Sequence, residues 1–313
     1  MKSLGGTHRA RNLHRVRLRT HSGPPQPTTT IGPWRLTRRL SSGGRLAIFR
    51  AAVVNDPGPG CYVLKMPQRI QPPDEMACAL LQREAALAAE VNDVSLVPVV
   101  ATNLHSPQPY LVLPYLEGIT LRRSLDSRPD VASASAVRLP VSFALCIVRQ
   151  VAAALAAMHA AGWLHGQVRP EHVIVSPQGH ATLIDLTQAR RLESSECRTD
   201  GTLPVAPACS APEMFASRAQ LDAAADVYSL GVLLFEIIGG RPPFAAPSPR
   251  RLAICHRREV PPDVRVLRAD ASLEVSELIR RMLAKEPLRR PSDEQVIRWL
   301  AELEIEELSG AGF

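Results

Sequence analysis

The sequence is poor in lysine and in aromatic residues. Only three of its 37 basic residues are lysines, and aromatic residues make up 4% of the 313 positions. Because the chain uses arginine almost everywhere, an internal lysine is a candidate for a specific role. The three lysines are Lys2, Lys65 and Lys285, and Lys65 is the one that stands out.

Paired cysteines and long apolar runs are also missing. None of the six cysteines belongs to a C-x-x-C pair, which excludes the usual zinc-site spacing and gives no sign of a disulfide framework. A reducing, intracellular compartment is the simplest interpretation. The longest apolar stretches are interrupted at Arg149, Gln150 and Glu236, so we expect no segment of the roughly 18–20 residues that a membrane span needs. Residues 1–22 lack the apolar core of a secretory signal, and we therefore expect a cytoplasmic protein without a membrane span.

Acidic residues are absent from the first 50 positions, which contain 11 lysines and arginines. The net charge of +7 hides this asymmetry, because the remaining chain has 26 bases against 30 acids, a net charge of −4. Residues 1–30 are predicted to be a basic, disordered arm. Nucleic acid could bind only through this arm, which has no interleaved aromatic residues for base stacking. A merely solvated basic tail is the alternative interpretation.

The rest of the chain has an ordinary globular composition, with 45% apolar and 21% charged residues overall. Its patterns predict an α+β fold of two lobes, a small β-rich N-lobe with one helix and a larger, mainly helical C-lobe. Ser292 and Gln295 form a predicted capping box for the last helix. The N-lobe is expected at 31–116, the C-lobe at 117–308 and a short tail at 309–313. The N-lobe strands are expected at 31–40, 47–54, 61–66, 97–101 and 110–113, around a helix at 74–91. The main C-lobe helices are expected at 145–162, 225–238, 273–284 and 293–308, with short strands at 173–175 and 182–184.

Eight short motifs follow one another along the predicted lobes. Each is weak by itself, but their order and spacing are specific. Together they resemble the Ser/Thr protein kinase family, in its bacterial eukaryotic-like form, over nearly the whole of residues 31–308. The motifs are Val63–Lys65, Glu84, His165–Gln167, Asp185–Thr187, Ala211–Glu213, Asp226–Gly231, Gly240–Phe244 and Arg290–Pro291.

The resemblance implies a site for ATP and Mg²⁺. Lys65 matches the lysine that contacts the nucleotide phosphates, and Glu84 matches the carboxylate that pairs with this lysine. Asp185 matches the aspartate that holds the metal, and a carboxylate is a hard oxygen ligand suited to Mg²⁺. The resemblance also places three further residues among the nucleotide-binding positions: Gly43, Leu113 and Tyr115.

Two departures predict that ATP binding is weak. The glycine-rich loop keeps Gly43, but the positions of its first and third glycines are Ser41 and Leu46. A leucine brings a side chain to a place where the backbone should approach phosphate closely. Val63 stands where the family has a small alanine, so its extra methyl groups should crowd a purine.

The predicted catalytic loop departs further from the family pattern. Gln167 occupies the position of the catalytic aspartate, and an amide has no useful basicity near neutral pH. His172 replaces the asparagine that is the second metal ligand, and imidazole is a poor ligand for Mg²⁺. Gly166 replaces the arginine that reads a phosphate on the activation loop. Glu171 is the nearest carboxylate, but the family has an ordinary glutamate there.

The structural positions of the family are retained. Glu213 and Arg290 match an ion pair that ties the activation segment to the large lobe, and Asp226 matches the buried aspartate that anchors the catalytic loop. We interpret the chain as a pseudokinase, a regulatory protein that binds a protein partner and has at most weak affinity for ATP. The alternative is a low-activity Ser/Thr protein kinase that transfers the γ-phosphate of ATP to a protein hydroxyl, because positioning and metal electrostatics carry most of phosphoryl-transfer catalysis.

Overall fold

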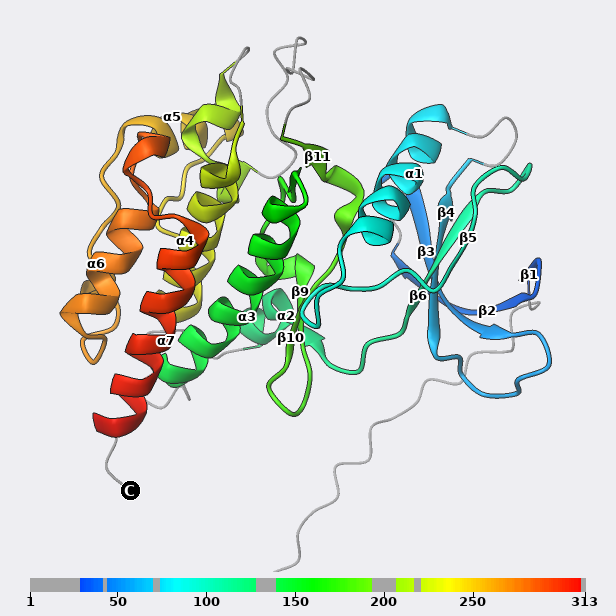
Figure 1. Cartoon of the computed structure of the whole chain (residues 1–313), viewed down its shortest axis with the longest axis horizontal. Helices are drawn as coiled ribbons and strands as arrows, with labels where there is room; N and C mark the ends of the chain where they lie inside the picture. Colours follow the sequence, from blue (N-terminus) through cyan, green and yellow to red (C-terminus); the bar gives the residue numbers. More distant parts are fainter. Residues whose placement is uncertain are drawn as a thin grey trace, which may run out of the picture.

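The computed structural model describes residues 29–41, 44–69, 74–127, 139–192, 207–216 and 221–310. Its strands gather in one lobe and its long helices in another (Figure 1). The α+β, bilobal fold expected from the sequence is therefore confirmed. Most of the expected N-terminal arm, residues 1–28, lies outside the described residues, and so do Gly43 and residues 311–313.

The N-lobe is built on one six-stranded antiparallel sheet in the order β1-β2-β3-β4-β6-β5. Its fifth strand begins later than the sequence suggested, because the expected segment 97–101 contributes only its last residue to the strand. The backbone of Val97 instead donates a hydrogen bond to the carbonyl of Leu183 in the other lobe, at 3.0 Å. The strands are β1 (Thr30–Ile31), β2 (Trp34–Ser41), β3 (Leu46–Val53), β4 (Tyr62–Pro67), β5 (Ala101–Asn103) and β6 (Tyr110–Pro114).

Helix α1 (Glu75–Glu90) lies beside this sheet (Figure 1). Asp74 caps its first turn by accepting hydrogen bonds from the backbone amides of Met76 and Ala77. The buried stripe of the helix is Ala77, Leu81, Glu84 and Leu87. The apolar spacing of Met76, Leu80, Leu87 and Val91 in the sequence predicts a different stripe, and this prediction was wrong at Met76, which is 55% exposed. The correct stripe includes a carboxylate, so apolar spacing alone could not reveal it.

The C-lobe packs its helices around α4 (Ala223–Gly239), whose residues from Ala225 to Gly239 are all buried. Helix α4 ends at Gly240, which adopts the left-handed conformation at φ 77°. The predicted capping box is present on α7 (Asp293–Gly310), because Ser292 and Gln295 exchange hydrogen bonds of 3.0 and 3.4 Å. The other helices are α2 (Leu121–Asp126), α3 (Val141–Ala160), α5 (Pro249–Arg258) and α6 (Leu273–Met282).

Helix α3 is long and apolar enough to cross a membrane, judged by length and composition only, and it is one such helix among the described residues. The sequence analysis had set this segment aside because of Arg149 and Gln150. Ten of its residues are buried, and it packs against α4 and α7 (Figure 1). Its surroundings are those of a core helix.

Short strands and turns connect the lobes and hold the segments that carry the motifs. Strands β7 (Ile119–Thr120), β9 (Val173–Val175) and β10 (Ala181–Leu183) form a three-stranded sheet in the order β10-β9-β7. Strand β8 (Trp163–Leu164) pairs with β11 (Arg190–Arg191). The loop 165–172 runs from β8 to β9, and Asp185 follows β10, so both segments are brought to the same place.

Candidate functional site

Lys65 is buried between the two lobes and binds two carboxylates. Its Nζ atom lies 2.8 and 2.9 Å from the two carboxylate oxygens of Glu84 and 3.3 Å from Oδ1 of Asp185. Lys65 is 4% exposed and Glu84 is fully buried. The structure thus brings together the three residues that the sequence assigned to phosphate and metal binding.

The opposite charges of Lys65 and Asp185 stabilise each other, whereas burial raises the pKa of Glu84. Burial by itself would lower the pKa of Lys65, but the carboxylates of Glu84 and Asp185 raise it well above its usual value. Burial would likewise raise the pKa of Asp185, but Lys65 and His172 hold it below its usual range. Lys65 is therefore an ammonium and Asp185 a carboxylate at neutral pH.

Asp185 has an unusual backbone conformation. It lies in the left-handed region, at φ 65°, and is the one non-glycine residue with a positive φ in the part of the chain that the structure describes. Such a conformation costs about 1–3 kcal/mol and is concentrated at functional sites. Thr187 donates a hydrogen bond of 2.9 Å to Oδ1 of Asp185. The intervening residue, Leu186, is buried. Thr187 belongs to the motif Asp185–Thr187, and this hydrogen bond gives it a positioning role that the sequence did not indicate.

The floor beside Lys65 is apolar. Side chains alternate between the two faces of a strand, and the register pairs Lys65 with Leu111, Val63 with Leu113, and Leu46 with Pro67. Leu46, Val63 and Leu113 therefore project from the same face of the sheet as Lys65. Leu46 and Leu113 are buried in the core, and Val63 packs against that core. These residues offer a surface for a flat apolar group next to Lys65.

Tyr115 lies just beyond strand β6, at the end of this floor. Its backbone amide donates to the carbonyl of Cys61 at 2.8 Å, and the guanidinium of Arg50 lies 3.9 Å from the centre of its ring. Gly43, the remaining residue assigned to nucleotide binding, lies outside the described residues.

The loop 165–172 is fixed by its backbone. Asp226 of α4 accepts hydrogen bonds from the amides of His165 at 2.7 Å and Gly166 at 2.9 Å. Gly166 is in the left-handed region at φ 72°, which favours glycine. Asp226 thus has the anchoring contacts that the sequence predicted for it.

His159 of α3 links Asp226 of α4 to Asp293 of α7. Its ring nitrogens lie 3.1 Å from Asp226 and 2.8 Å from Asp293 at the start of α7. Burial would lower the pKa of His159, but its hydrogen bonds to the carboxylates of Asp226 and Asp293 raise it to about 9. His159 is therefore a charged link between α3, α4 and α7, and the sequence analysis did not identify it.

The carboxylate of Glu171 is occupied by two arginines. It lies 2.7 Å from Arg169 and 3.1 Å from Arg122, and Arg122 also binds the buried Glu236 at 2.7 Å. Burial would raise the pKa of Glu171, but the two arginines lower it to about 2. Glu171 is consequently a very weak base, and it is a poor replacement for the carboxylate missing at Gln167.

His172 connects Gln167 to Asp185. Its Nδ1 atom lies 3.0 Å from the backbone carbonyl of Gln167, and its Nε2 atom lies 3.3 Å from Oδ2 of Asp185. Burial lowers the pKa of His172 below its usual value. The ring is in contact with the carboxylate that the resemblance assigns to metal binding.

The ion pair between Glu213 and Arg290 is present. Arg290 donates to both carboxylate oxygens of Glu213, at 2.6 and 2.8 Å, and its side chain is completely buried. It also donates to the backbone carbonyls of Ala224, Ala284 and Lys285. This arginine joins the segment before α4 to the segment before α7.

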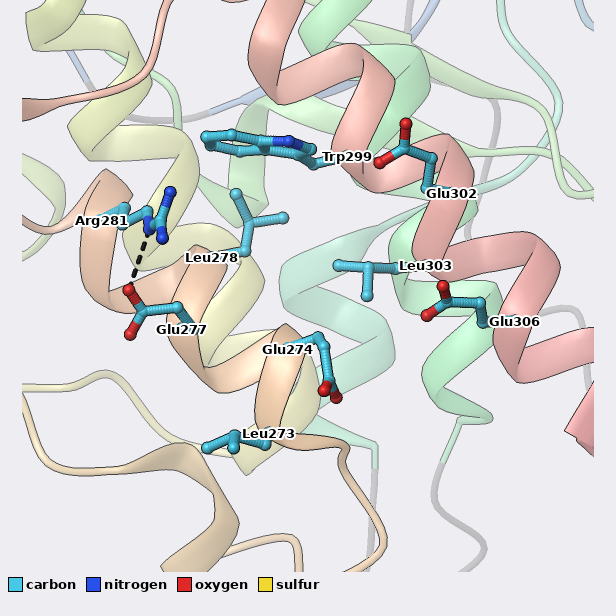
Figure 2. A pocket seen from close by; sticks show the side chains of 9 residues that line it. All are labelled: Leu273, Glu274, Glu277, Leu278, Arg281, Trp299, Glu302, Leu303 and Glu306. Atoms are coloured by element: carbon cyan, nitrogen blue, oxygen red, sulfur yellow. Dashed lines mark hydrogen bonds and ion pairs between the residues drawn. The ribbon is translucent and has the colours of Figure 1, made fainter.

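A separate groove lies between α6 and α7, away from Lys65 (Figure 2). Its volume is about 390 Å³. Four apolar side chains, four glutamates and one arginine line it. They are Leu273, Leu278, Trp299 and Leu303, then Glu274, Glu277, Glu302 and Glu306, and Arg281.

The fold and the sequence are both similar to those of known protein kinases. The family model described as protein kinase domain matches residues 54–299. The crystallised kinase domain of PknI from Mycobacterium tuberculosis superposes with a TM-score of 0.64 at 23% sequence identity, covering 89% of this chain and 98% of that chain. This likeness shows the fold.

Curated relatives are similar over most of this chain. The serine/threonine-protein kinase PknL of Mycobacterium tuberculosis is 29% identical over 260 residues, and PknD of the same species is 30% identical over 267 residues. These matches cover 82% and 85% of this chain, but 61% and 39% of the relatives, so the chain spans only part of their length. A probable serine/threonine-protein kinase of Bifidobacterium longum is 25% identical over 84% of this chain and 34% of its own length. The chain belongs to the protein kinase family.

Proposed function

We propose that this chain is a regulatory protein with a kinase fold that binds a nucleotide and transfers phosphate very slowly or not at all. One observation carries the proposal: the position of the catalytic base is the amide Gln167, and the carboxylate of Glu171 in the same loop is held by Arg122 and Arg169. A positioned base contributes typically about 10²–10⁴ in rate.

The residues of the nucleotide site fit a bound ATP and a divalent cation. Lys65 supplies a buried positive charge for phosphate oxygens, and the apolar floor beside it suits a base. Asp185 and His172 are the residues that would hold the cation. When bound, such a cation would neutralise phosphate charge. The weak affinity expected from Leu46 and Val63 is part of this proposal.

A slow Ser/Thr protein kinase is the second candidate. It is favoured by the contacts of Lys65 with Glu84 and Asp185, since a charged, assembled group of this kind serves transfer as well as binding. The relatives PknL and PknD are named as kinases. Positioning and electrostatics supply much of phosphoryl-transfer catalysis, so the loss of a base need not abolish it.

We further propose that the protein acts in the cytoplasm by binding a protein partner. A regulator without transfer activity can pass on a signal only through binding. The nucleotide would then act as a conformational ligand, because its phosphates contact Lys65 of the N-lobe and its cation contacts Asp185 between the lobes.

The first experiment is to measure thermal unfolding of the full chain with and without nucleotide and divalent cation. A ligand at 100 times its Kd adds about 2.7 kcal/mol to the free energy of unfolding, which corresponds to an increase of several degrees in Tm. Cation-dependent stabilisation that is lost in Lys65→Ala, without phosphate transfer to a protein substrate, supports the regulatory function. Robust transfer abolished by Lys65→Ala would establish the kinase instead, and no stabilisation by any nucleotide would exclude both nucleotide-dependent functions.

A further inference from the structure

The hydrogen bonds of His172 fix the position of its proton. Nδ1 lies 3.0 Å from the carbonyl oxygen of Gln167, and a carbonyl can only accept. Nδ1 must therefore carry the hydrogen. In a neutral imidazole the other nitrogen, Nε2, then presents a lone pair.

This lone pair faces a second acceptor. Nε2 of His172 lies 3.3 Å from Oδ2 of Asp185, while the other oxygen of Asp185 accepts from Thr187 and contacts Lys65. An imidazole nitrogen and a carboxylate oxygen 3.3 Å apart can occupy two adjacent coordination positions of one cation. The hydrogen bond from Nδ1 to a backbone carbonyl is also the usual outer contact of a histidine that ligates a metal.

From this geometry we propose that the nucleotide-bound cation of this protein is held by one nitrogen and one oxygen, Nε2 of His172 and the carboxylate of Asp185, and that the site selects a first-row transition cation over Mg²⁺. Imidazole suits transition cations, whereas Mg²⁺ prefers oxygen ligands. The proposal rests on the nucleotide binding proposed above.

The nucleotide is needed to complete this site. The part of the chain that the structure describes contains no group of three or more histidine, cysteine or acidic side chains arranged to hold a metal. Two protein ligands leave most coordination positions to phosphate oxygens and water. The expected behaviour is therefore weak binding of the cation alone and much tighter binding together with ATP.

The test uses the full chain with ATP and either Mn²⁺ or Mg²⁺, and compares it with His172→Asn. The wild-type protein should bind Mn²⁺-ATP several-fold more tightly than Mg²⁺-ATP, because imidazole nitrogen is a poor ligand for Mg²⁺. His172→Asn should remove most of this difference, because an amide oxygen replaces the imidazole nitrogen. The apparent Kd values can be obtained from thermal unfolding or calorimetry, without an activity measurement.

Pulsed electron paramagnetic resonance of bound Mn²⁺ provides a direct readout. The signal of a coordinated ¹⁴N nucleus is expected in the wild-type complex and should be absent in His172→Asn. If nucleotide binds equally well with both cations and no nitrogen signal appears, the inference is overturned while the proposed function stands. If no cation supports nucleotide binding, both are overturned.

A second inference concerns the groove between α6 and α7, and it is independent of the nucleotide. The groove combines an apolar floor at Leu278, Trp299 and Leu303 with the carboxylates of Glu274, Glu302 and Glu306 (Figure 2). Its one arginine, Arg281, is paired with Glu277 at 2.9 Å, so the remaining charge of the lining is negative. Such a lining is complementary to a segment in which arginines alternate with apolar residues.

The first 22 residues of this chain have that composition. They contain six lysines and arginines and no acidic residue, with Leu13, Val16 and Leu18 among the arginines. The 28 residues before Thr29 could extend over about 90 Å, so length does not prevent the segment from reaching the groove. We infer that residues 1–22 occupy the groove of the same molecule.

Limited trypsin cleavage of the full chain tests this inference, because the segment contains five arginines between positions 9 and 19. Cleavage there should be several-fold faster in the double variant Glu302→Lys/Glu306→Lys than in the wild-type protein, and high salt should accelerate cleavage of the wild type. Glu294→Lys, an exposed change on the same helix but outside the groove, is the control and should behave like the wild type. Equal cleavage rates in all three proteins would overturn the inference.

Discussion

The two ends of the site differ in whether they keep the functional side chains of the family. At one end, Lys65, Glu84 and Asp185 keep both the positions and the chemical groups that phosphate and metal binding require. At the other end, the loop 165–172 keeps its position, through the hydrogen bonds of Asp226, but its reactive groups have changed. Asp226 binds backbone amides, so this anchor does not depend on the side chain of Gln167. A fold can therefore hold a catalytic loop in place after the loop has lost its catalytic group.

Removal of the Asp226 carboxylate should have the largest effect, and this effect is on the free energy of unfolding. In Asp226→Ala two backbone amides and His159 lose their partner inside the core, and breaking a buried charged contact of this kind costs about 3–5 kcal/mol. We expect this loss in the free energy of unfolding, measured by urea denaturation. Gln167→Ala is the matched control in the same loop and should change stability little. A small effect of Asp226→Ala would mean that the loop is held by other contacts.

Restoration of the family's residues at Gln167 and His172 tests whether the loop 165–172 is still placed for catalysis. In Gln167→Asp/His172→Asn the loop regains the base and the oxygen ligand of the family pattern, and we expect phosphate transfer to a protein substrate to increase by roughly 10²–10⁴. The increase should disappear when Lys65→Ala is added. If the double variant transfers no phosphate, then the backbone anchor does not place this loop for catalysis.

The nucleotide end can be separated into binding and stability. Lys65→Met leaves Glu84 buried without its partner, so it should lower the free energy of unfolding by about 3–5 kcal/mol and abolish stabilisation by nucleotide. Adding Glu84→Leu should recover much of the stability, since replacing a whole buried ion pair is often neutral. Nucleotide binding should not recover, as calorimetry would show. Recovery of both would mean that Lys65 contributes to the fold alone.

The pH dependence of stability should be the smallest and broadest effect. The pKa of His159 is raised to about 9 in the folded state, against an ordinary value of about 6.5. Its contribution is therefore complete below about pH 6.5 and is lost as the pH rises toward 9. Denaturation at a series of pH values should show this loss, and His159→Gln should remove it.

The loss of stability at low pH depends on two other histidines. Burial lowers the pKa values of His165 and His256 to about 4. The unfolded chain therefore takes up protons first, and stability should fall as the pH drops from about 6.5 to 4. His256→Gln should reduce this loss and leave the alkaline loss unchanged. An alkaline loss that persists in His159→Gln would contradict the assignment to His159.

The sequence predicted the two lobes and the pairing of Lys65 with Glu84 correctly, because these residues belong to short, ordered motifs. It misjudged the buried stripe of α1, since Glu84 occupies a core position that apolar spacing does not mark. The contacts of Arg122 with Glu171 and Glu236 could not be predicted, because nothing local in the sequence brings these residues together. The proton of His172 also became assignable only with the carbonyl of Gln167 in place. What the sequence could not provide was the pairing of polar groups across the fold.

The scarcity of lysine has a practical consequence for chemical labelling. Burial lowers the pKa of Lys285 to about 8, so a larger fraction of its side chain is the free amine at neutral pH than for an ordinary lysine. Lys65 is almost inaccessible and is held as an ammonium by two carboxylates. An acyl-phosphate analogue of a nucleotide would reach Lys65 only from within the site. Since the chain has just three lysines, the position of the label in a peptide map would report occupancy of the site with little background, even in a crude extract.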